Sequence, residues 1–494
     1  MNQTLKKIRI WLFLTTLLLV LPLFSSCASS SPKLDPDSPV VLTIWHHYLA
    51  EQKLVFDTYI DEFNRTTGKE KGIVIKAYSM DNSGDIHQKI IQAANNEPGA
   101  PKMPDMATVY PDTAYTLYNM GQLVPVEKYM EQKRLDQYVG SFLEEGRLTD
   151  DSGICVFPIA KSTELLFINN TVYSRFLEDY NRRNPANPLS EEMLGTFEGI
   201  MKTAQAYYSW TDAKTPGIPN DGAALFGYDA VSNFAVVGYR QLEDSFFRVH
   251  GQSGAVNLAS PAFEKIWDFY YVPMALGYFG AYSFYRSEDV QTGDLVMYTG
   301  STAGANFFPK TVTYQDNTKL NAELKVLPYP VFEGGKKAAA QQGAGVAIIK
   351  STPEKEYAAT IFLEWFTEPQ RNTAFVLNTG YLPVTKEALD HVLPQELDKL
   401  KNVPEYANVL KVIHQALAMM KNYQLYSYKP FEKCDKMRRI FEDRFLAAAQ
   451  EGRKTFAREL AAGKDFGTVV KDITAKDRFE RFIVEVDNEI SKAD

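Results

Sequence analysis

Cysteine and histidine are scarce in this chain. Its 494 residues include three cysteines and six histidines. Cys155 and Cys434 lie so far apart in the chain that they indicate neither a disulfide framework nor a metal site. They could pair in an oxidising compartment, but we expect two free, buried thiols. His46 and His47 are adjacent, yet no other histidine follows at ligand spacing, so we expect no metal ion.

Signatures of catalysis are also missing. The sequence contains no HExxH, no GxSxG and no GxxxxGK[ST] motif. Gly343-Ala-Gly345 lacks the third glycine of a dinucleotide-binding fingerprint. Carboxylates are plentiful enough for a glycosidase, but a sequence cannot place two of them about 5–10 Å apart. We therefore expect no enzymatic activity and no cofactor, with a surface-anchored carbohydrate-active enzyme as the alternative of another class.

Positive charge is in deficit, because 61 acidic residues outweigh 53 Lys and Arg and give a formal charge of −8. Loss of an N-terminal segment that carries Lys6, Lys7 and Arg9 would make the remaining chain more negative. Nucleic-acid binding requires basic patches that neutralise phosphates. We therefore expect no nucleic-acid partner.

The apolar run from Trp11 to Phe24 is too short for a comfortable membrane span and follows the three basic residues, as in a secretory signal. Its end, Phe24-Ser-Ser-Cys27, is similar to the bacterial lipobox, in which the cysteine becomes the lipidated first residue of the mature protein. We expect a lipoprotein signal peptide over residues 1–26 and lipidation, with palmitate, at Cys27. A plain secretory signal or an uncut anchor helix is the alternative. The Ser, Pro and Asp residues that follow predict a flexible tether over residues 27–39.

The chain then alternates predicted strands and helices. Strands are expected at 40–44, 72–78 and 105–110, with helices at about 51–64 and from Gly84 onward. This order is typical of βαβ units on a parallel sheet. Ligands of such sheets bind beyond the carboxyl ends of the strands. We therefore expect three polar side chains at that edge to contact a ligand: Tyr48, Asp85 and Asp112.

The stretch from Gln341 to Val384 combines a glycine-rich turn, a short apolar strand, an amphipathic helix and an exit through Gly380. The helix places Ala358, Ile361, Phe362 and Trp365 on one face, which we expect to be buried. Earlier, residues 293–301 predict a strand that opens at Ser301 into a small-residue loop and a helix start. Backbone amides there would suit an anionic or hydroxyl ligand, and a solvated loop is the alternative.

Several motifs in order resemble the extracellular solute-binding proteins of ABC importers, in the group that serves sugars and glycerol phosphates. The motifs span about residues 40–450 and are Trp45-His46, Met103-Pro-Asp-Met-Ala-Thr108, Leu166-Phe-Ile-Asn169, Thr292-Gly-Asp-Leu-Val-Met297, Leu327-Pro-Tyr-Pro330 and Gly380-Tyr-Leu-Pro-Val384. The resemblance implies an α/β, two-lobed periplasmic-binding-protein fold of type II. Each lobe would be a mainly parallel sheet flanked by helices, with a multi-strand hinge crossing near 160–163, 342–345 and 381–384.

The same resemblance implies the remaining ligand-binding residues. Within the family, the motif order is most similar to binding proteins for glycerol phosphates. Their cleft serine matches Ser162 or Thr163, next to Glu164, and their stacking aromatic matches Phe197. Four further positions match a phosphate-contacting serine, a backbone donor, a ligand tyrosine and a phosphate-binding arginine, namely Ser301, Gly343, Tyr381 and Arg438. Arg438 could equally be a solvated helix charge, and each aromatic could instead fill a core.

Some positions depart from the glycerol-phosphate pattern. Pro111 occupies the place of an acidic ligand residue, a tyrosine is missing near Asp85, and residues 175–195 and 211–222 resemble insertions. A sugar or oligosaccharide is therefore the preferred ligand, and a glycerol phosphate or glycerophosphodiester is the alternative. Aromatic residues make up 13% of the chain, and tyrosine in particular offers a flat apolar face and a polar tip to a sugar.

These expectations divide the chain into a signal peptide, a tether and two lobes, with boundaries at 1–26, 27–39, 40–160 plus 345–380 for lobe 1, and 161–342 plus 384–494 for lobe 2. The expected partners are a small-molecule solute, the membrane subunits of an ABC permease and, through the lipid, a membrane. We expect a monomer on the extracytoplasmic face of the cell membrane, or a lipoprotein facing a periplasm. A scaffold or adhesin without a ligand is a third alternative.

Overall fold

The computed structural model describes residues 31–80 and 83–492. The chain divides into two compact units, Met1–Lys33 and Leu34–Asp494. The predicted signal peptide and Cys27 lie outside the described residues. Residues 34–39, which the sequence assigned to the tether, belong to the second unit: Leu34 packs against a hydrophobic core and the Ser38 amide donates to the Asp35 carbonyl (3.1 Å).

The second unit contains two lobes, each built on its own sheet. The first lobe has a five-stranded sheet of order β2-β1-β3-β14-β4. Its strands are β1 (Val40–His46), β2 (Ile73–Ser79), β3 (Met106–Val109), β4 (Leu123–Val124) and β14 (Gly345–Ile349). Its helices are α2 (Ala50–Arg65), α3 (Thr67–Lys71), α4 (Ser83–Ala94), α5 (Pro111–Asn119), η2 (Val126–Lys128), α6 (Gln132–Leu135), α7 (Gly140–Glu145), α13 (Pro353–Phe366) and α14 (Pro369–Thr379).

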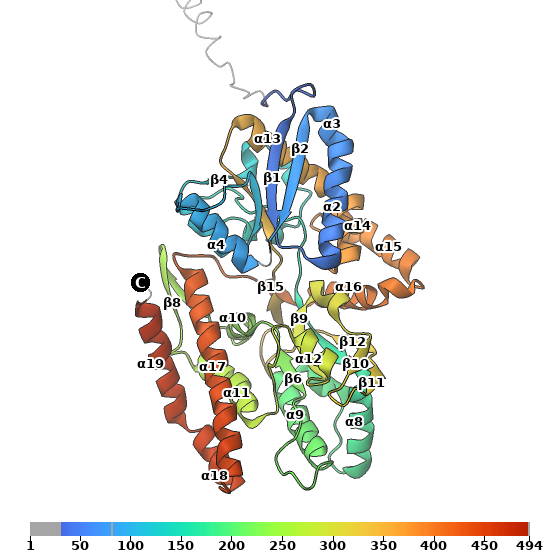
Figure 1. The fold of residues 1–494 in the computed structure, drawn as a ribbon, viewed down its shortest axis with the longest axis vertical. Coiled ribbons are helices and arrows are strands. Elements are labelled where there is room, and N and C mark those ends of the chain that lie inside the picture. The colour runs from blue at the N-terminus through green and yellow to red at the C-terminus, as the bar shows by residue number, and fades with distance from the viewer. Residues whose placement is uncertain (1–30, 81–82, 493–494) are drawn as a thin grey trace, which may run out of the picture. The chain divides into compact units, whose positions relative to one another are not determined.

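Both faces of this first sheet are buried, because successive strand residues point to opposite sides. Leu42 and Ile44 of β1 join one hydrophobic cluster with residues of α2, α13 and α14. Trp45 joins the other cluster with residues of α4 and α5. Figure 1 shows α2 along one side of β1 and β2 and α4 along the other.

The amphipathic helix predicted after β14 is confirmed but is shorter than expected. Ala358, Phe362 and Trp365 are buried in the first-lobe core, as the helical spacing predicted. The helix ends at Phe366, and α14 begins at Pro369. Proline cannot continue a helix through its interior but is favourable in a first turn, so the segment folds as two helices.

The second lobe has a four-stranded sheet of order β12-β5-β9-β6. Its strands are β5 (Glu164–Asn169), β6 (Phe226–Tyr228), β9 (Met297–Ser301) and β12 (Leu324–Leu327). Three strand pairs accompany it: β7 (Phe247–His250) with β8 (Ser253–Val256), β10 (Thr311–Thr313) with β11 (Lys319–Asn321), and β13 (Ala338–Ala340) with β15 (Gln424–Tyr426).

The helices of the second lobe surround that sheet and include the C-terminal part of the chain. They are α8 (Asn170–Arg183), η3 (Glu191–Gly195), α9 (Phe197–Asp212), α10 (Val231–Gln241), α11 (Pro261–Leu276), α12 (Arg286–Thr292), η4 (Thr302–Phe307), η5 (Ala388–Val392), α15 (Leu393–Leu400), η6 (Pro404–Tyr406), α16 (Ala407–Met420), α17 (Cys434–Ala461), α18 (Phe466–Ile473) and α19 (Lys476–Lys492). Figure 1 shows α19 beside α17, and both helices contribute phenylalanines to one large core. The helices predicted over 394–420, 430–450 and 475–490 are therefore present, the first of them in two parts.

The two-lobed α/β fold is confirmed, and each sheet is mainly parallel with one reversed strand. In the second sheet β5 runs antiparallel to both β12 and β9, whereas β6 runs parallel to β9, so that β12, β9 and β6 share one direction. The reason is the direction of the crossing. Glu164, at the start of β5, pairs with Ser301, at the end of β9, so β5 enters the sheet at the edge where β9 leaves it. A strand that enters from the other lobe must run against its neighbours, and β14 does the same beside β3 in the first sheet.

Candidate functional site

Three chain segments cross between the lobes and are joined by backbone hydrogen bonds. The Ser162 amide donates to the Gln342 carbonyl (2.8 Å) and the Gln342 amide donates back to Ser162 (3.0 Å). The Lys161 amide donates to the Leu382 carbonyl (3.0 Å). These contacts fall within the crossings that the sequence predicted near 160–163, 342–345 and 381–384, so the multi-strand hinge is confirmed. Ser162 and Thr163 are buried within it.

Gly343 is a glycine because two hinge strands meet there. Its φ is +96°, and a Cβ would lie 2.8 Å from the Ala160 carbonyl oxygen and 3.0 Å from the Lys161 Cα. The buried ammonium of Lys161 also donates to the Gly343 carbonyl (2.7 Å) and pairs with Glu145 (2.8 Å). Gly343 thus closely approaches another hinge strand, and its role as a backbone donor to a ligand stays a prediction.

A cavity of about 380 Å³ lies beside the hinge and is lined by both lobes. The first lobe contributes residues at the start of α4, residues at the end of β3 and Glu145 of α7. The second lobe contributes α10, the segment after β15 and the first turns of α17. The lining residues are Gly84, His87, Tyr110, Pro111, Asp112, Thr113, Glu145, Ala230, Asn233, Val236, Val237, Ala340, Gln341, Gln342, Tyr426, Ser427, Tyr428, Asp435, Arg438, Arg439 and Glu442.

Asp112 and Arg438, two of the predicted ligand residues, lie in this cavity on opposite lobes. Asp112 is in the first turn of α5, which starts with Pro111, and its carboxylate accepts the Thr113 amide (3.0 Å). A carboxylate at a helix N-terminus is favoured by the helix dipole. Because Arg438 and Asp112 both face the same cavity, the structure brings opposite charges from the two lobes to one place.

The guanidinium of Arg438 is oriented by side chains of α10. Its Nε donates to the Ser232 hydroxyl (2.9 Å) and its Nη2 donates to the side-chain Oδ1 of Asn233 (2.8 Å). Ser232 in turn donates to Glu442 (2.9 Å). Burial lowers the pKa of Arg438, but the nearby Tyr428, Asp112 and Glu442 outweigh it and raise that pKa above its ordinary value. Arg438 is therefore a fixed cation and not a solvated helix charge.

Glu164 is a buried carboxylic acid at the hinge. Its side chain is 3% exposed and its Oε1 accepts from the Asn233 amide (2.7 Å). The pKa of Glu164 is raised to about 7, chiefly by burial and also by the carboxylates of Asp229 and Glu442. The hydrogen bond from Asn233 and the charge of Arg438 lower it in part. The Asn233 amide also donates to Gln342 (2.8 Å). Asn233 thus connects the hinge to Arg438.

Four tyrosines interact near the hinge, but of these only Tyr110 lines the cavity, and Tyr48 and Tyr381 are buried in the first-lobe core. Tyr48 and Tyr381 of the first lobe have ring centroids 6.2 Å apart. Burial raises the pKa of Tyr381, and the neighbouring hydroxyls of Tyr48, Tyr110 and Tyr285 raise it further. Tyr285 belongs to the second lobe, and Tyr110 also lines the cavity. Among the residues that the structure describes, the hydroxyls of Tyr48, Tyr110 and Tyr381 form no hydrogen bond with the protein. We call these four residues the tyrosine group.

The remaining predicted residues lie elsewhere. Phe197 does not line the cavity: it is 1% exposed in the second-lobe core, with its ring centroid 4.9 Å from that of Phe332. Asp85 lies next to the cavity-lining Gly84 and pairs with Lys89 (3.0 Å). Ser301 caps the 3-10 helix η4, as the predicted helix start required, because its hydroxyl accepts the Ala303 amide (3.2 Å).

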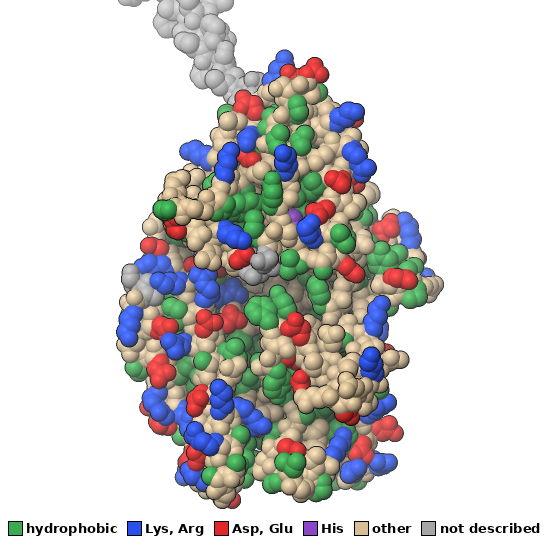
Figure 2. Space-filling view, in the orientation of Figure 1, with side chains coloured by type: hydrophobic (Ala, Val, Ile, Leu, Met, Phe, Trp, Pro, Cys, Tyr) green, Lys and Arg blue, Asp and Glu red, His purple; other side chains and the backbone are tan. Residues whose placement is uncertain are grey.

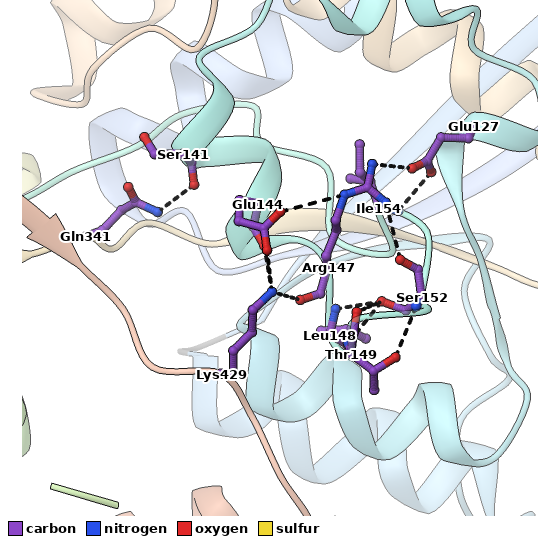
Figure 3. Close-up of polar contacts among 10 residues, drawn as sticks. All are labelled: Glu127, Ser141, Glu144, Arg147, Leu148, Thr149, Ser152, Ile154, Gln341 and Lys429. Atoms are coloured by element: carbon purple, nitrogen blue, oxygen red, sulfur yellow. Dashed lines mark hydrogen bonds and ion pairs between the residues drawn. The ribbon is translucent and has the colours of Figure 1, made fainter. Parts of the chain in front are cut away.

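A second set of contacts joins the lobes at the rim of the cavity (Figure 3). Lys429, from the segment that follows β15, reaches the C-terminal end of α7. Its ammonium donates to the Glu144 carboxylate (2.6 Å), to the Glu144 carbonyl (3.4 Å) and to the Arg147 carbonyl (3.0 Å). Arg147 is itself held by Glu127 (2.9 Å). Because a helix C-terminus carries partial negative charge, a lysine there is favoured.

A histidine makes a further contact between the lobes. His87 of α4 lies 3.2 Å from Asp435 of α17, and its Nδ1 lies 2.9 Å from the Thr113 hydroxyl. Burial lowers the pKa of His87, whereas Asp435 raises it. His46 and His47 lie apart from this contact, and burial lowers the pKa of each to about 4. Within residues 31–80 and 83–492, no group of three His, Cys, Asp or Glu side chains could hold a metal ion.

The two cysteines of the folded unit are free and buried, as expected. Cys155 packs in the first lobe and Cys434 in the second. Burial raises the pKa of the Cys155 thiol to about 11 and that of the Cys434 thiol to about 12. Thiols with raised pKa values are poor nucleophiles and poor metal ligands at neutral pH.

Sequence reasoning missed Tyr110, Asn233, Gln342 and Tyr285. Tyr110 ends a predicted strand, so the rule that located Asp112 could also have found it. Gln342 lies inside the predicted crossing. Asn233 and Tyr285 carried no signal, because their neighbourhood is made by segments distant in sequence.

Comparison with known proteins supports the fold. None of the curated protein sequences matches the chain significantly. Among solved structures, the cyclic α-maltosyl-1,6-maltose binding protein of Arthrobacter globiformis is 15% identical, with a TM-score of 0.62 over 91% of this chain and 99% of the other. UgpB of Mycobacterium tuberculosis in complex with glycerophosphocholine is 16% identical, with a TM-score of 0.62 over 92% and 100%. Maltose-bound MalE3 of T. maritima is 16% identical, with a TM-score of 0.59 over 89% and 98%.

Two further observations concern membrane association and family. No helix in the described part of the chain has the length and apolar character that crossing a membrane requires. The sequence profile of the family described as bacterial extracellular solute-binding protein matches residues 58–405. That match covers well over half of the chain and includes strands of both sheets, so the chain belongs to the bacterial extracellular solute-binding protein family.

Proposed function

We propose that this protein captures a sugar or oligosaccharide in the cleft between its lobes and delivers it to an ABC permease. The observation that carries the proposal is the cavity between the lobes, in which Tyr110 of the first lobe and Tyr428 of the second lie with Asp112, Asn233 and Glu442. A sugar presents apolar ring faces and many hydroxyls. Tyrosine rings can pack on the faces, while carboxylate and amide oxygens accept from the hydroxyls.

Transport requires a change of shape on binding, and the hinge supplies the means. A solute that contacts both lobes favours the closed arrangement by the difference between its affinities for the closed and open states. Asp112 and Tyr110 would hold the solute on the first lobe, and Asn233 and Arg438 on the second. Closure would then present a surface that the permease can recognise.

The names of similar structures agree with this ligand class. They include proteins that bind maltose, maltotriose and mannotriose. The charge of the cavity agrees as well. Arg438 faces the carboxylates of Asp112 and Glu442, so an added anion would meet repulsion that a neutral sugar avoids.

A thermal-shift screen of sugars, polyols and glycerophosphodiesters tests the proposal. A ligand at about 100 times its Kd stabilises the folded protein by roughly 2.7 kcal/mol, which is visible as a rise in Tm. For the sugar that binds, Tyr110→Phe should weaken affinity by about 2- to 10-fold, since Tyr110 lines the cavity and one hydrogen bond contributes about 0.5–1.5 kcal/mol. Tyr173→Phe is the matched control, because the Tyr173 hydroxyl is buried in the second-lobe core without a partner and does not line the cavity. A panel in which no solute raises the Tm would contradict the proposal.

A glycerophosphodiester is the second candidate, supported by the fixed guanidinium of Arg438 and by the likeness to UgpB in its glycerophosphocholine complex. Bidentate pairing of arginine with a phosphate is strong. Arg438→Ala should abolish binding of a phosphodiester and leave a neutral sugar bound within a few-fold. The two ligand classes are thereby separated with one variant.

We also propose that the protein performs no catalysis. The absence of a catalytic motif and the family's description as solute-binding proteins support this. Hydrolysis of a bound glycoside by the purified protein would show that it is an enzyme instead.

We propose an extracytoplasmic, lipid-anchored monomer, on the basis of the lipobox-like Phe24-Ser-Ser-Cys27 sequence and the family description. Cys27→Ala should abolish incorporation of labelled palmitate and release the protein from membranes. Unchanged membrane association of that variant would speak for an anchor helix that stays uncut.

A further inference from the structure

A short segment between α11 and α12 exposes three aromatic side chains. Tyr282 is 61% exposed, Phe284 80% and Tyr285 49%. Single exposed apolar residues are ordinary on protein surfaces, but three exposed aromatic side chains within four residues form an apolar patch, which is typical of a binding site. We call residues 282–285 the aromatic segment. In the view of Figure 2, hydrophobic side chains border the hollow between the two lobes.

Buried charges fix the backbone of the aromatic segment. Asp289 is 0% exposed and accepts the amides of Tyr282 (3.2 Å) and Ser283 (2.7 Å). Arg286 pairs with Asp289 (2.8 Å) and donates to the carbonyls of Ser283 and Phe284. A buried ion pair adds little net stability, since desolvation offsets its attraction. The Arg286–Asp289 pair instead holds the backbone of this loop in one conformation before any ligand binds.

The side chains of the segment are also positioned. The ring of Tyr282 lies over Gly280, where a Cβ would come within 2.5 Å of it. The rings of Phe284 and Tyr285 pack edge to face with centroids 4.7 Å apart. Rigid aromatic residues bind with little loss of conformational entropy. The segment therefore has the properties of a prepared binding surface.

The aromatic segment is continuous with the cleft. Its last residue, Tyr285, precedes Arg286, whose amide donates to the Asp229 carboxylate (2.9 Å). Ala230, directly after Asp229, lines the cavity together with Tyr110. Aromatic surface thus runs from the cavity through Tyr285 to Phe284 and Tyr282, which are the more exposed members.

We propose that the aromatic segment is an outer sugar subsite, and that the solute is an oligosaccharide too long for the inner cavity alone. This inference rests on the proposed function. The inner cavity would hold one end of the chain, and the outer units would pack on Phe284 and Tyr282. Flat rings with polar tips suit the alternating apolar faces and hydroxyls of a sugar chain.

The test compares chain lengths in the full protein. Affinities are measured by calorimetry for malto- and manno-oligosaccharides of one to six units. Phe284→Ala should weaken binding of the longer chains about tenfold, which is about 1.4 kcal/mol, and leave the shortest sugar that binds unchanged. Gly280→Ala, which displaces the Tyr282 ring without removing an aromatic residue, should weaken the same long chains. Phe466→Ala, at a 42% exposed phenylalanine on α18, is the matched control and should change none of them.

Three other outcomes overturn different claims. If sugars bind but Phe284→Ala affects long and short chains equally, or affects none, the outer subsite is wrong while the proposed function stands. Loss of uptake with unchanged sugar affinity would mean that the segment contacts the permease, and it too overturns the subsite. If no sugar binds the unaltered protein, both the proposed function and the subsite fall.

Discussion

The buried carboxyl of Glu164 predicts a specific dependence of stability on pH. Its pKa is raised from 4.5 to about 7, chiefly by burial at the hinge. Between pH 4.5 and 7 the folded protein therefore binds more protons at this site than the unfolded chain. Stability that is fully present below pH 4.5 is lost as the pH rises through 7. Since each unit of pKa difference corresponds to about 1.4 kcal/mol, the loss is about 3 kcal/mol.

Glu164→Gln removes this titration and keeps the shape of the side chain. The glutamine oxygen can still accept from Asn233, as the Glu164 Oε1 does at 2.7 Å. The variant and the wild type should be similarly stable at pH 4.5, whereas at pH 8 the variant should be the more stable by about 3 kcal/mol.

Urea unfolding at the two pH values measures the difference, and effects of all other titrating groups cancel between variant and wild type. Glu70→Gln makes the same change of charge on the exposed helix α3 and should alter stability by no more than about 0.5 kcal/mol at either pH. A stability difference between Glu164→Gln and wild type that is the same at pH 4.5 and pH 8 would refute the reasoning.

Three further variants test contacts between and within the lobes. Lys429→Met removes the ammonium that contacts Glu144 and Arg147 across the lobes. Because the Lys429–Glu144 ion pair is partly exposed, we expect the closed state to lose about 1 kcal/mol, measured as roughly fivefold weaker solute binding. Unchanged binding would mean that this contact does not favour closure. Gly343→Ala should destabilise the protein by about 1–3 kcal/mol in urea unfolding, because φ of Gly343 is +96° and the Ala160 carbonyl leaves no room for a Cβ. Wild-type stability of this variant would contradict that hinge geometry. Phe197→Leu should lower stability by about 1 kcal/mol and leave solute affinity unchanged, because the ring is buried in the second-lobe core. Weaker solute binding without a loss of stability would show instead that Phe197 contacts the ligand.

Much of the first lobe followed from local pattern. The apolar strands at residues 40–46, 73–79 and 106–109 were predictable because fully buried parallel strands consist of continuous β-branched and apolar runs. The rule that ligands lie beyond the carboxyl ends of parallel strands located Asp112 at the cavity, whereas the Tyr48 ring is buried in the first-lobe core. The second sheet was harder, because the direction of β5 depends on where the chain crosses from the first lobe.

Phe197 shows where a positional match to relatives was not enough. The match put an aromatic residue in the right part of the sequence. Its side chain is enclosed by Phe332 and Phe234, with ring centroids 4.9 and 5.2 Å away, and both come from other segments. Whether an aromatic residue faces a cleft or a core is decided by those neighbours, and a single sequence does not contain that information.

The sequence by itself determined the solute-binding family, the lack of a catalytic motif, the lipobox-like N-terminus and the three hinge crossings. Each of these depends on residues adjacent in the chain or on motifs in a fixed order. Only the tertiary structure decided that Asn233 orients Arg438, that Glu164 is buried, and that the rings of Tyr48 and Tyr381 pack together. Desolvation and hydrogen bonding act over a few ångströms in space, so they depend on which distant segments the fold brings together.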